Sequence, residues 1–395
     1  MTLRTLLFST LYPSAIRPDH GIFVETRLRE LLATGGVSTK VVAPVPWFFS
    51  THPRFGEYAR MAGIPARETH NGIDISHPRY FLPPKVGMNV APFLLALGAI
   101  PAIKRLIREG FDFDLIDAHY VYPDGVAAAL LARYFGKPFV VTARGTDINL
   151  IPQYTVPRKL IQSTLDKAAA SIGVCQALVD EMQELGAAPE KLHVLRNGVD
   201  LQRFHPIPPS EARSKLGWNE DRKTLISVGY LIERKGHHIA IEALPDLPDF
   251  RLEIIGRGPD QEKLKQLASQ LGVADRVSFV GHVNQAELPT YYSAVDALIL
   301  ASSREGWANV LLESMACGTP VVATNIWGTP EVVSSTVAGR LMHERSAESL
   351  GSAVRDLFSS YPDRREVRRH AEHYSWNATS EGQLRLFKNI VSITA

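Results

Sequence analysis

The sequence predicts an α/β protein of two domains, each a parallel sheet covered by helices. Its 395 residues are enough for two separate cores. In the stretch 297–324, a buried strand (297–300) is followed by a polar loop, a helix of roughly 11 residues and a second strand (321–323). Such a unit belongs to a parallel sheet, in which ligands bind at the carboxyl ends of the strands.

The composition is that of an ordinary globular protein, with 45% hydrophobic and 21% charged residues. The formal net charge of +2 gives no reason to expect a nucleic-acid partner. The two cysteines, Cys175 and Cys317, are too few for a disulfide framework, which favours a reducing compartment, and they lack the spacing of a metal site. We therefore expect a cytoplasmic protein without a bound metal.

The N-terminal half of the sequence alternates between strands and helices. Its first apolar run, 5–9, favours a buried strand over a signal peptide, because the run is short and Tyr12 and Pro13 follow it. No run of about 20 uninterrupted apolar residues occurs, so we expect no membrane span. The other strands expected here are 39–43, 114–119, 138–142, 171–174 and 193–195, and helices are expected from residue 22, over 126–134 and up to about residue 185.

The segment 46–110 is the least regular part of the sequence. It contains the apolar run 90–103, which is followed by Lys104, Arg105 and Arg108. A basic and apolar segment of this kind fits the surface of an anionic membrane. It fits equally well a packed helix with a solvated basic end. Both interpretations stay open, so an anionic membrane surface is one candidate partner.

The C-terminal half repeats the alternation after Pro206, Pro208 and Pro209, which make a stiff linker of the kind an interdomain hinge needs. Strands are expected at 224–228, 251–255, 277–280, 297–300 and 321–323. Helices are expected at 288–294, from 328 to 339, at 348–358 and at 375–391.

Two glutamates in the stretch 297–324 are spaced in a way that suits a ligand. Glu305 lies at the mouth of the expected helix, and Glu313 follows about 12 Å further along, within a quadrant of the same face. This distance matches the reach from a hexose across a diphosphate to a ribose. The free N–H groups of Gly306 to Asn309 would seat an anion. Two solvated glutamates are the plain alternative, whereas a glycosidase pair is excluded because it needs a separation of about 5–9.5 Å.

Glu305 and Glu313, with seven residues between them and followed by the run A-C-G-T-P-V-V-A, resemble the E-x7-E motif of the retaining glycosyltransferases of family 4. The resemblance covers nearly the whole chain. It implies the GT-B fold, with two Rossmann-like domains that face each other across a cleft. The acceptor-binding domain would cover 1–205 and 375–395, including a returning terminal helix, and the nucleotide-sugar-binding domain would cover 206–374.

In the second domain, the resemblance implies a donor site that needs no metal. Lys235 matches the lysine of the family's G-R-L-x-x-x-K-G segment and would be catalytic with Glu305, gripping the diphosphate while Glu305 orients the sugar. Tyr230 stands where an arginine is usual, and Arg234 is a candidate substitute. Glu313 would anchor the ribose. The remaining nucleotide-binding candidates lie near the phosphates and the base: Gly229, Gly256, Gly258, Val283, Gly306, Asn309 and Val310.

In the first domain, the resemblance implies that His119, at the end of a strand, contacts the transferred sugar as a catalytic group. A structural hydrogen-bonding histidine is the alternative. The segment from Arg144 to Asp147 resembles the family's H-G-[ST]-D, with Arg144 in the histidine position, and both residues are acceptor-side candidates. An Asx-turn is the plain account of Asp147. Gly21, in the loop after the first strand, would approach the diphosphate and the acceptor.

The activity implied by the resemblance is transfer of a glycosyl group, with retained anomeric configuration, from a nucleotide sugar to a glycan or lipid-linked acceptor in polysaccharide or cell-surface glycan synthesis. The donor is UDP-linked by family habit, with GDP and ADP open, and no cofactor is implied. In the front-face attack proposed for relatives, the leaving phosphate accepts the acceptor's proton. A lipid-linked acceptor would draw the protein to the inner face of the cytoplasmic membrane. A sugar-nucleotide epimerase of the same fold and a non-catalytic nucleotide-sugar-binding subunit of a polysaccharide assembly complex are the alternatives.

Overall fold

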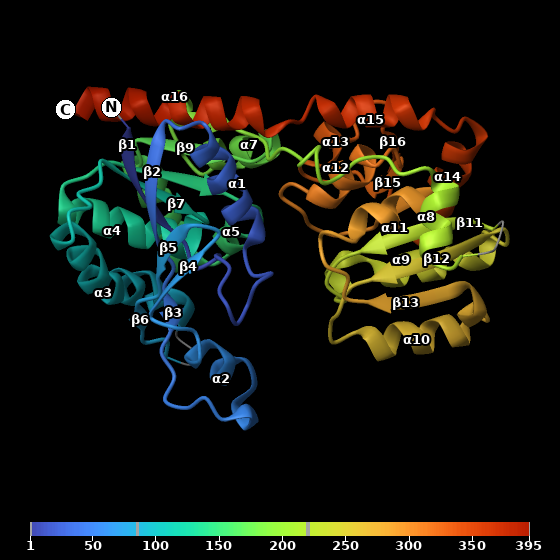
Figure 1. Ribbon diagram of the computed structural model, residues 1–395, viewed down its shortest axis with the longest axis horizontal. Coiled ribbons are helices and arrows are strands. Elements are labelled where there is room, and N and C mark those ends of the chain that lie inside the picture. Colours follow the sequence, from blue (N-terminus) through green and yellow to red (C-terminus); the bar gives the residue numbers. More distant parts are fainter. Residues whose placement is uncertain (1, 84–86, 219–221, 395) are drawn as a thin grey trace. The chain divides into compact units, whose positions relative to one another are not determined.

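The structure is a computed structural model that describes residues 2–83, 87–218 and 222–394. The chain forms two compact units, one over Met1–Arg196 and Asn377–Ala395 and the other over Asn197–Trp376 (Figure 1). Each unit is an α/β structure with its own parallel sheet, as the sequence predicts. The change of unit falls at residues 196 and 197, ahead of the proline-rich segment 206–209.

The sheet of the first unit has the strand order β10-β9-β8-β7-β1-β2-β5-β4. All neighbouring strands are parallel except β4 and β5, which pair antiparallel at one edge. The central strands β7 and β8 are buried along their whole length, because helices cover both faces of this sheet. The strand bounds are β1 Leu3–Phe8, β2 Val37–Val42, β4 Arg67–His70, β5 Ile73–Ser76, β7 Leu115–His119, β8 Phe139–Ala143, β9 Ala170–Gly173 and β10 Leu192–Val194, and β3 Val45–Pro46 pairs separately with β6 Arg79–Tyr80.

The last helix of the chain, α16, packs against this first sheet (Figure 1). Its Phe387 and Ile390 lie in one core cluster with Leu3 of β1 and Leu115 of β7, so the C-terminus completes the N-terminal core. The helices of the unit are α1 Ile22–Ala33, α2 Gly56–Ala62, α3 Gly87–Arg108, α4 Val126–Phe135, α5 Thr146–Asn149, α6 Thr155–Lys167, α7 Gln176–Glu184 and α16 Trp376–Thr394.

The apolar run 90–103 forms most of helix α3, which packs against α4 and β6. Among the described residues it is the one helix whose length and composition would allow a membrane crossing. Within its most apolar stretch, 39% is buried inside the structure. One such helix is weak evidence for a membrane span, because the core helix of a soluble protein meets the same criterion. Its outward side nevertheless exposes Phe93 and Leu97.

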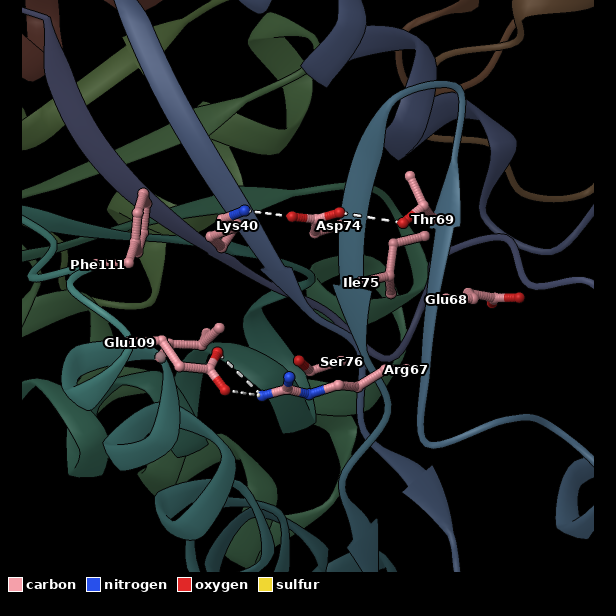
Figure 2. A pocket seen from close by; sticks show the side chains of 10 residues that line it. Lys40, Arg67, Glu68, Thr69, Asp74, Ile75, Ser76, Glu109 and Phe111 are labelled. Carbon is pink, nitrogen blue, oxygen red and sulfur yellow. Dashed lines mark hydrogen bonds and ion pairs between the residues drawn. The ribbon is translucent and has the colours of Figure 1, made fainter.

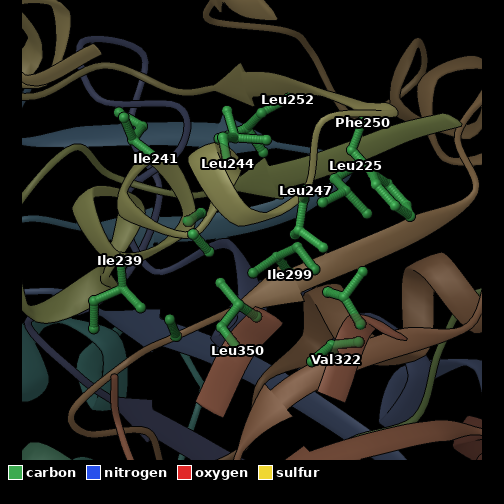
Figure 3. Packing of buried hydrophobic residues seen from close by; sticks show 14 of the residues in the cluster. Leu225, Ile239, Ile241, Leu244, Leu247, Phe250, Leu252, Ile299, Val322 and Leu350 are labelled. Carbon is green, nitrogen blue, oxygen red and sulfur yellow. The ribbon is translucent and has the colours of Figure 1, made fainter. Parts of the chain in front are cut away.

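The sheet of the second unit is wholly parallel, in the order β13-β12-β11-β14-β15-β16. Leu225, Leu252, Ile299 and Val322 come from four of these strands and pack with Leu350 of α14 in one core (Figure 3). The strand bounds are β11 Lys223–Val228, β12 Phe250–Ile255, β13 Val277–Gly281, β14 Ala297–Leu300, β15 Val321–Thr324 and β16 Gly339–Met342. The helices are α8 Pro209–Lys215, α9 His237–Glu242, α10 Gln261–Gln270, α11 Leu288–Ala294, α12 Asn309–Ala316, α13 Thr329–Val332, α14 Ala347–Ser359 and α15 Arg364–Glu372.

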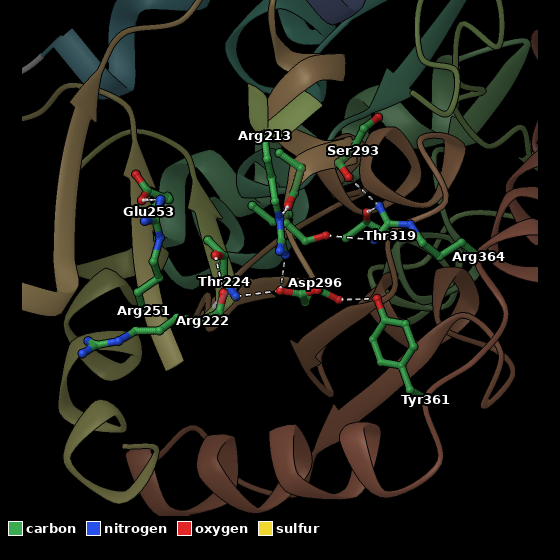
Figure 4. A network of polar contacts seen from close by, with 12 residues as sticks. Arg213, Arg222, Thr224, Arg251, Glu253, Ser293, Asp296, Thr319, Tyr361 and Arg364 are labelled. Atoms are coloured by element: carbon green, nitrogen blue, oxygen red, sulfur yellow. Dashed lines mark hydrogen bonds and ion pairs between the residues drawn. The ribbon is translucent and has the colours of Figure 1, made fainter. Parts of the chain in front are cut away.

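A polar network around Asp296 joins several elements of the second unit at the start of β14 (Figure 4). The Asp296 carboxylate accepts hydrogen bonds from the Arg213 guanidinium at 2.9 Å and from the Thr224 backbone N–H at 2.7 Å. Its backbone carbonyl accepts one from the Tyr361 hydroxyl at 2.7 Å. The network lies at the amino ends of β11 and β14, opposite the edge at which ligands bind. Its role is therefore structural.

The structure corrects the sequence prediction at several elements of the second unit, and it forms helices α8, α9, α10 and α15 where none was expected. The helix expected from Gly306 begins only at Asn309. The helix expected up to Gly339 ends at Val332, and Gly339 instead opens β16, where its backbone lies so close to β15 that a Cβ would stand 1.9 Å from the Val321 carbonyl oxygen. Helix α15 was missed, because only Val367 and Ala371 of its residues are buried and the apolar periodicity is correspondingly weak.

Candidate active site

The structure brings the site residues predicted in the second unit to one edge of its sheet. Gly229 follows β11, Gly256 follows β12 and Glu305 follows β14, and these three strands are parallel neighbours. Lys235 ends a 3-10 turn, Glu233–Lys235, in the connection after β11. These loops therefore share the carboxyl edge of a parallel sheet, which is where α/β proteins bind their ligands.

Lys235 and Glu305 contact each other directly. The ammonium of Lys235 donates to Oε1 of Glu305 at 2.6 Å, and the Ser302 hydroxyl donates to the same oxygen at 2.7 Å. The side chains are only 19% and 10% exposed, so little water competes with this charge-assisted contact. A cation and a carboxylate are thus held beside each other just beyond the end of β14.

Arg234 brings a second cation close to this pair. Its guanidinium lies 4.0 Å from Oε1 of Glu305 and donates to the Arg304 carbonyl at 2.7 Å. Tyr230, in the place of the usual arginine, is 59% exposed and adds no charge. Arg234 therefore supplies positive charge near Glu305, although it lies four residues after the position of the usual arginine.

Glu305 lies in a loop and not on the helix, so the separation of about 12 Å from Glu313 that was expected along a helix is not supported. Helix α12 begins at Asn309, so the rise of an ideal helix does not apply between Glu305 and Glu313. Gly306 belongs to the same loop, ahead of the buried Trp307 and Ala308. Asn309 and Val310 are the first residues of the helix, whose opening N–H groups lack acceptors within the helix.

Glu313 lies on α12 beside the fully buried Tyr292. The Tyr292 hydroxyl donates to Oε2 of Glu313 at 3.1 Å. Burial raises the pKa of Glu313 to about 7, although the Tyr292 hydrogen bond and the charge of Arg203 act in the opposite direction. At this pKa the carboxyl group is half ionised near neutral pH, and further hydroxyl donors would stabilise its charged form. A ribose diol offers such donors.

The predicted glycines after β12, Gly256 and Gly258, lie against the backbone of the loop after β11, whereas a Cβ on Gly229 would stand 3.6 Å from the Lys235 side chain. A Cβ on Gly256 would stand 1.8 Å from the Gly229 carbonyl oxygen, and one on Gly258 would stand 2.3 Å from that of Leu231. Glycine is therefore required for the packing of these loops whether or not a ligand binds. Val283 is half-buried in the loop after β13.

In the first unit, His119 ends β7 and is 1% exposed. Its Nε2 lies 3.2 Å from Oδ2 of Asp117, and its Nδ1 contacts the Arg144 guanidinium. Burial lowers the pKa of His119 to about 4, although Asp117 acts in the opposite direction. A guanidinium only donates, so Nδ1 is the acceptor and the neutral ring carries its proton on Nε2.

Asp147, a predicted acceptor-side residue, is fully buried, and its carboxylate accepts hydrogen bonds from backbone N–H groups. Its carboxylate accepts from Val121 at 2.7 Å, from Gly145 at 2.8 Å and from Arg144 at 3.1 Å. Burial raises the pKa of Asp147, and these hydrogen bonds oppose the rise. These donors precede Asp147 in the chain, so the arrangement is not the Asx-turn that the sequence left open; the carboxylate instead shapes the loop that carries Arg144 and ties it to the loop after β7.

Gly21 precedes α1 with a φ of 72°, in the left-handed region. A Cβ there would stand 2.3 Å from the Leu11 carbonyl carbon, so the β1–α1 connection folds tightly upon itself at this point. Gly21, His119 and Arg144 follow or end β1, β7 and β8, which are neighbours. The structure therefore brings them to one edge of the first sheet.

One pocket of the first unit, of about 410 Å³, lies away from these residues (Figure 2). Its charged groups are already paired, Lys40 with Asp74 and Arg67 with Glu109. None of the predicted site residues lines it. Within the part of the chain that the structure describes, no group of three or more His, Cys, Asp or Glu residues could hold a metal ion, and both cysteines are buried.

Sequence reasoning missed several residues that support the predicted ones. Ser302 lies inside the stretch that was singled out, so its hydroxyl could have been considered as a partner for Glu305. Asp117 lies two residues before His119 on one strand and therefore on the same face, which is a usable signal. Gln383, which donates to Asp117, is 266 residues away in sequence and has no local signal.

Comparison with known proteins identifies the family. The sequence model described as "Glycosyl transferases group 1" matches residues 210–374, and that described as "Glycosyltransferase Family 4" matches residues 58–203. The chain belongs to the family 4 glycosyltransferases. It is therefore a glycosyltransferase enzyme, as the resemblance of the E-x7-E stretch implied.

Among relatives, TuaC of Bacillus subtilis (strain 168), whose name assigns it to teichuronic acid biosynthesis, is 28% identical over 89% of this chain and 88% of its own. Sucrose-phosphate synthase from Thermosynechococcus elongatus has the same fold, with a TM-score of 0.81 and 19% identity over 100% of both chains. HepE from Anabaena, solved in complex with UDP-glucose, gives a TM-score of 0.71 at 20% identity over 98% of both chains. The two-sheet architecture is thus that of GT-B enzymes.

Proposed function

We propose that this glycosyltransferase takes a sugar from a nucleoside diphosphate donor, UDP-linked, that binds at the carboxyl edge of the second sheet. The observation that carries the proposal is the Lys235–Glu305 pair, which places a cation and a hydrogen-bonding carboxylate together at that edge. Arg234 adds positive charge beside them. The complex of HepE with UDP-glucose supports a uridine donor for a protein of this fold.

The donor would be held at three points along the second unit. Lys235, with Arg234, would meet the diphosphate, and the opening N–H groups of Asn309 and Val310 would face the same charge. Glu313 would accept hydrogen bonds from the ribose diol, while Glu305 would orient a sugar hydroxyl.

Transfer would keep the anomeric configuration. The bond between the anomeric carbon and the diphosphate oxygen breaks, and the acceptor oxygen bonds to the same face of that carbon. The proton of the acceptor hydroxyl passes to a leaving phosphate oxygen, so the products are a glycoside and a nucleoside diphosphate. Lys235 would offset the negative charge that grows on the leaving group. Electrostatic stabilisation of this kind is usually the largest single contribution to the rate enhancement of an enzyme.

The acceptor we propose is a glycan or lipid-linked sugar used in cell-surface polysaccharide synthesis. The assignment of TuaC to teichuronic acid biosynthesis supports this class. His119 and Arg144, at the edge of the first sheet, are the groups we assign to the sugar and acceptor side. His119 has both ring nitrogens engaged, so Arg144 would be the more direct contact.

A turnover assay tests the proposal. Purified protein is incubated with UDP-, GDP- and ADP-sugars and a mixture of lipid-linked and free glycan acceptors, and release of the nucleotide is compared with formation of the glycoside. Acceptor-dependent release of UDP supports the proposal. Release from a different donor corrects the base, and formation of an epimerised donor without transfer would favour the epimerase.

We also propose that the protein is cytoplasmic and contacts the inner face of an anionic membrane through α3. Phe93, Leu97 and Pro101 follow one another at helical spacing on the exposed side of this helix, and Arg105 and Arg108 are exposed toward its end. Sedimentation with vesicles of phosphatidylglycerol or of phosphatidylcholine tests this. Binding only to the anionic vesicles, lost in Leu97→Glu, supports it; equal recovery in the supernatant with both lipids would contradict it.

A further inference from the structure

A chain of hydrogen bonds joins the C-terminal helix to His119. Arg144 donates to Nδ1 of His119, and Nε2–H of His119 donates to Oδ2 of Asp117 at 3.2 Å. The side-chain amide of Gln383, on α16, donates to the same Asp117 oxygen at 3.1 Å. One imidazole ring is thus held by hydrogen bonds from three elements: the loop after β8, strand β7 and, through Asp117, the last helix.

The orientation of Gln383 is itself fixed by a second contact. Arg27 of α1 donates to Oε1 of Gln383 at 2.7 Å and to the Leu195 carbonyl at 2.9 Å. A guanidinium only donates and a carboxylate only accepts, so the amide oxygen must face Arg27 and the amide nitrogen must face Asp117. Arg27, Asp117, His119 and Gln383 are each no more than 2% exposed.

Asp117 depends on these two donors. Its other oxygen, Oδ1, is buried and has no hydrogen-bond partner within the described residues. A buried carboxylate held through one oxygen by two donors changes its position and its basicity when either donor is lost. The charged groups that face this part of the chain are Asp117 from β7, Arg144 from the loop after β8 and Arg27 from α1.

We infer that Gln383 is a positioning residue of the transfer site, which fixes Asp117 and thereby the orientation and proton pattern of His119 and the place of Arg144. This rests on the proposed function, in which His119 and Arg144 face the sugar and its acceptor. Helix α16 then contributes to transfer although none of its groups touches a substrate. Mutation of a residue that holds a functional histidine in place typically lowers activity by about 10–100-fold, as is known for the partners of metal-ligating histidines.

Two substitutions separate the contacts of Gln383. Gln383→Glu keeps an oxygen for Arg27 but replaces the donor to Asp117 with a second carboxylate. Gln383→Met keeps the length of the side chain and removes both hydrogen bonds. Thr379→Val is the matched control, because Thr379 lies one turn earlier on α16 and donates to the Arg196 carbonyl without touching the ring or its partners.

The test combines nitrogen NMR of histidine-labelled protein with donor kinetics. In the wild type, His119 should stay neutral with its proton on Nε2 at pH 6, because its pKa is about 4. In Gln383→Glu, the added negative charge should raise the pKa of His119, and kcat should fall about 10-fold while the donor KM changes less than about twofold. Thr379→Val should match the wild type in both measurements.

The outcomes are distinct. A folded Gln383→Glu protein whose His119 spectrum and titration match those of the wild type would overturn the inference, and so would an altered spectrum with unchanged kcat. If Gln383→Met does not fold, Gln383→Glu, which keeps the contact with Arg27, carries the test. A wild-type protein that transfers no sugar refutes the proposed function and with it the role of Gln383 in transfer, whereas the NMR measurement still decides whether Gln383 positions His119.

Discussion

The ammonium of Lys235 and the carboxylate of Glu305 are joined at 2.6 Å, although the two residues lie 70 positions apart in the sequence. The pair has a consequence for the ligand-free enzyme, because each group restrains the other before the donor arrives. In the proposed donor site, a diphosphate that binds Lys235 would share or displace this contact and release Glu305 toward the sugar. Orientation of both groups in advance of binding lowers the entropy that the reaction must lose.

Glu305→Gln should abolish most turnover while sparing nucleotide binding. The amide can still accept from Ser302, but it loses the charge that holds Lys235 and that, in the proposed function, polarises the sugar. We expect kcat to fall by about 10²–10³-fold and the Kd for UDP to change by less than about threefold. Initial rates and calorimetry measure both quantities. Glu262→Gln is the control, since Glu262 forms an exposed ion pair with Lys265 at 2.9 Å; near-normal turnover in Glu305→Gln would refute the catalytic role.

Glu313 should make the stability of the ligand-free protein depend on pH. Its pKa is about 7 in the folded protein and has an ordinary value of 4.5. Because the folded value is the higher one, its stabilising contribution is complete below about pH 4.5 and is lost as the pH rises through 7. Glu313→Gln should therefore be more stable than the wild type by about 1–2 kcal/mol at pH 8 and equal to it near pH 4. Urea unfolding at both pH values checks this, and a pH-independent difference would contradict it.

Asp147→Ala should destabilise the first unit. Removing the carboxylate leaves the backbone N–H groups of Val121, Gly145 and Arg144 without their acceptor in a buried loop. We expect the free energy of unfolding to fall by about 2–4 kcal/mol. Asp180→Ala, on the exposed surface of α7, should change it by less than about 0.5 kcal/mol. Equal melting temperatures for the two variants would show that these three hydrogen bonds contribute no net stability.

Turnover should persist in the presence of EDTA. In the proposed donor site, the positive charges of Lys235 and Arg234 would offset the negative charge of the leaving diphosphate, as a divalent cation does in other enzymes. We expect the rate to stay within about twofold of the untreated enzyme, because a fixed ammonium can perform this electrostatic role. A rate that EDTA abolishes and added Mg²⁺ or Mn²⁺ restores would show that the cations of the protein do not suffice.

The fold could be predicted from the sequence largely because both sheets are parallel, apart from the antiparallel pair of β4 and β5 at one edge. Buried strands of such sheets are short apolar runs, and 297–300 shows one clearly. The weaker signals failed where packing, and not periodicity, decides the structure: β16 lies where a helix was expected, and α15 has too few buried residues to show an apolar face.

The sequence indicated the candidate site residues one by one, but not the contacts between them. Strand ends and motifs indicated Lys235, Glu305 and His119 separately, since each follows or ends a strand. Their partners depend on pairings distant in sequence, such as Gln383 with Asp117, which no local pattern reveals. The start of α12 was misplaced by three residues, because Glu305 is held by Lys235 and Ser302 outside the helix.

The donor site in the second unit is tested most directly by calorimetric titration of UDP. Wild type, Lys235→Ala, Glu313→Ala and the surface control Lys265→Ala are titrated under one buffer at about pH 7.5. The wild type and Lys265→Ala should bind UDP with the same Kd, and Lys235→Ala and Glu313→Ala should each bind at least about 10-fold more weakly, as expected for loss of a charged contact. Unchanged UDP affinity in both site variants, or no binding of UDP, GDP or ADP to the wild type, would contradict the assignment of this edge to the nucleotide sugar.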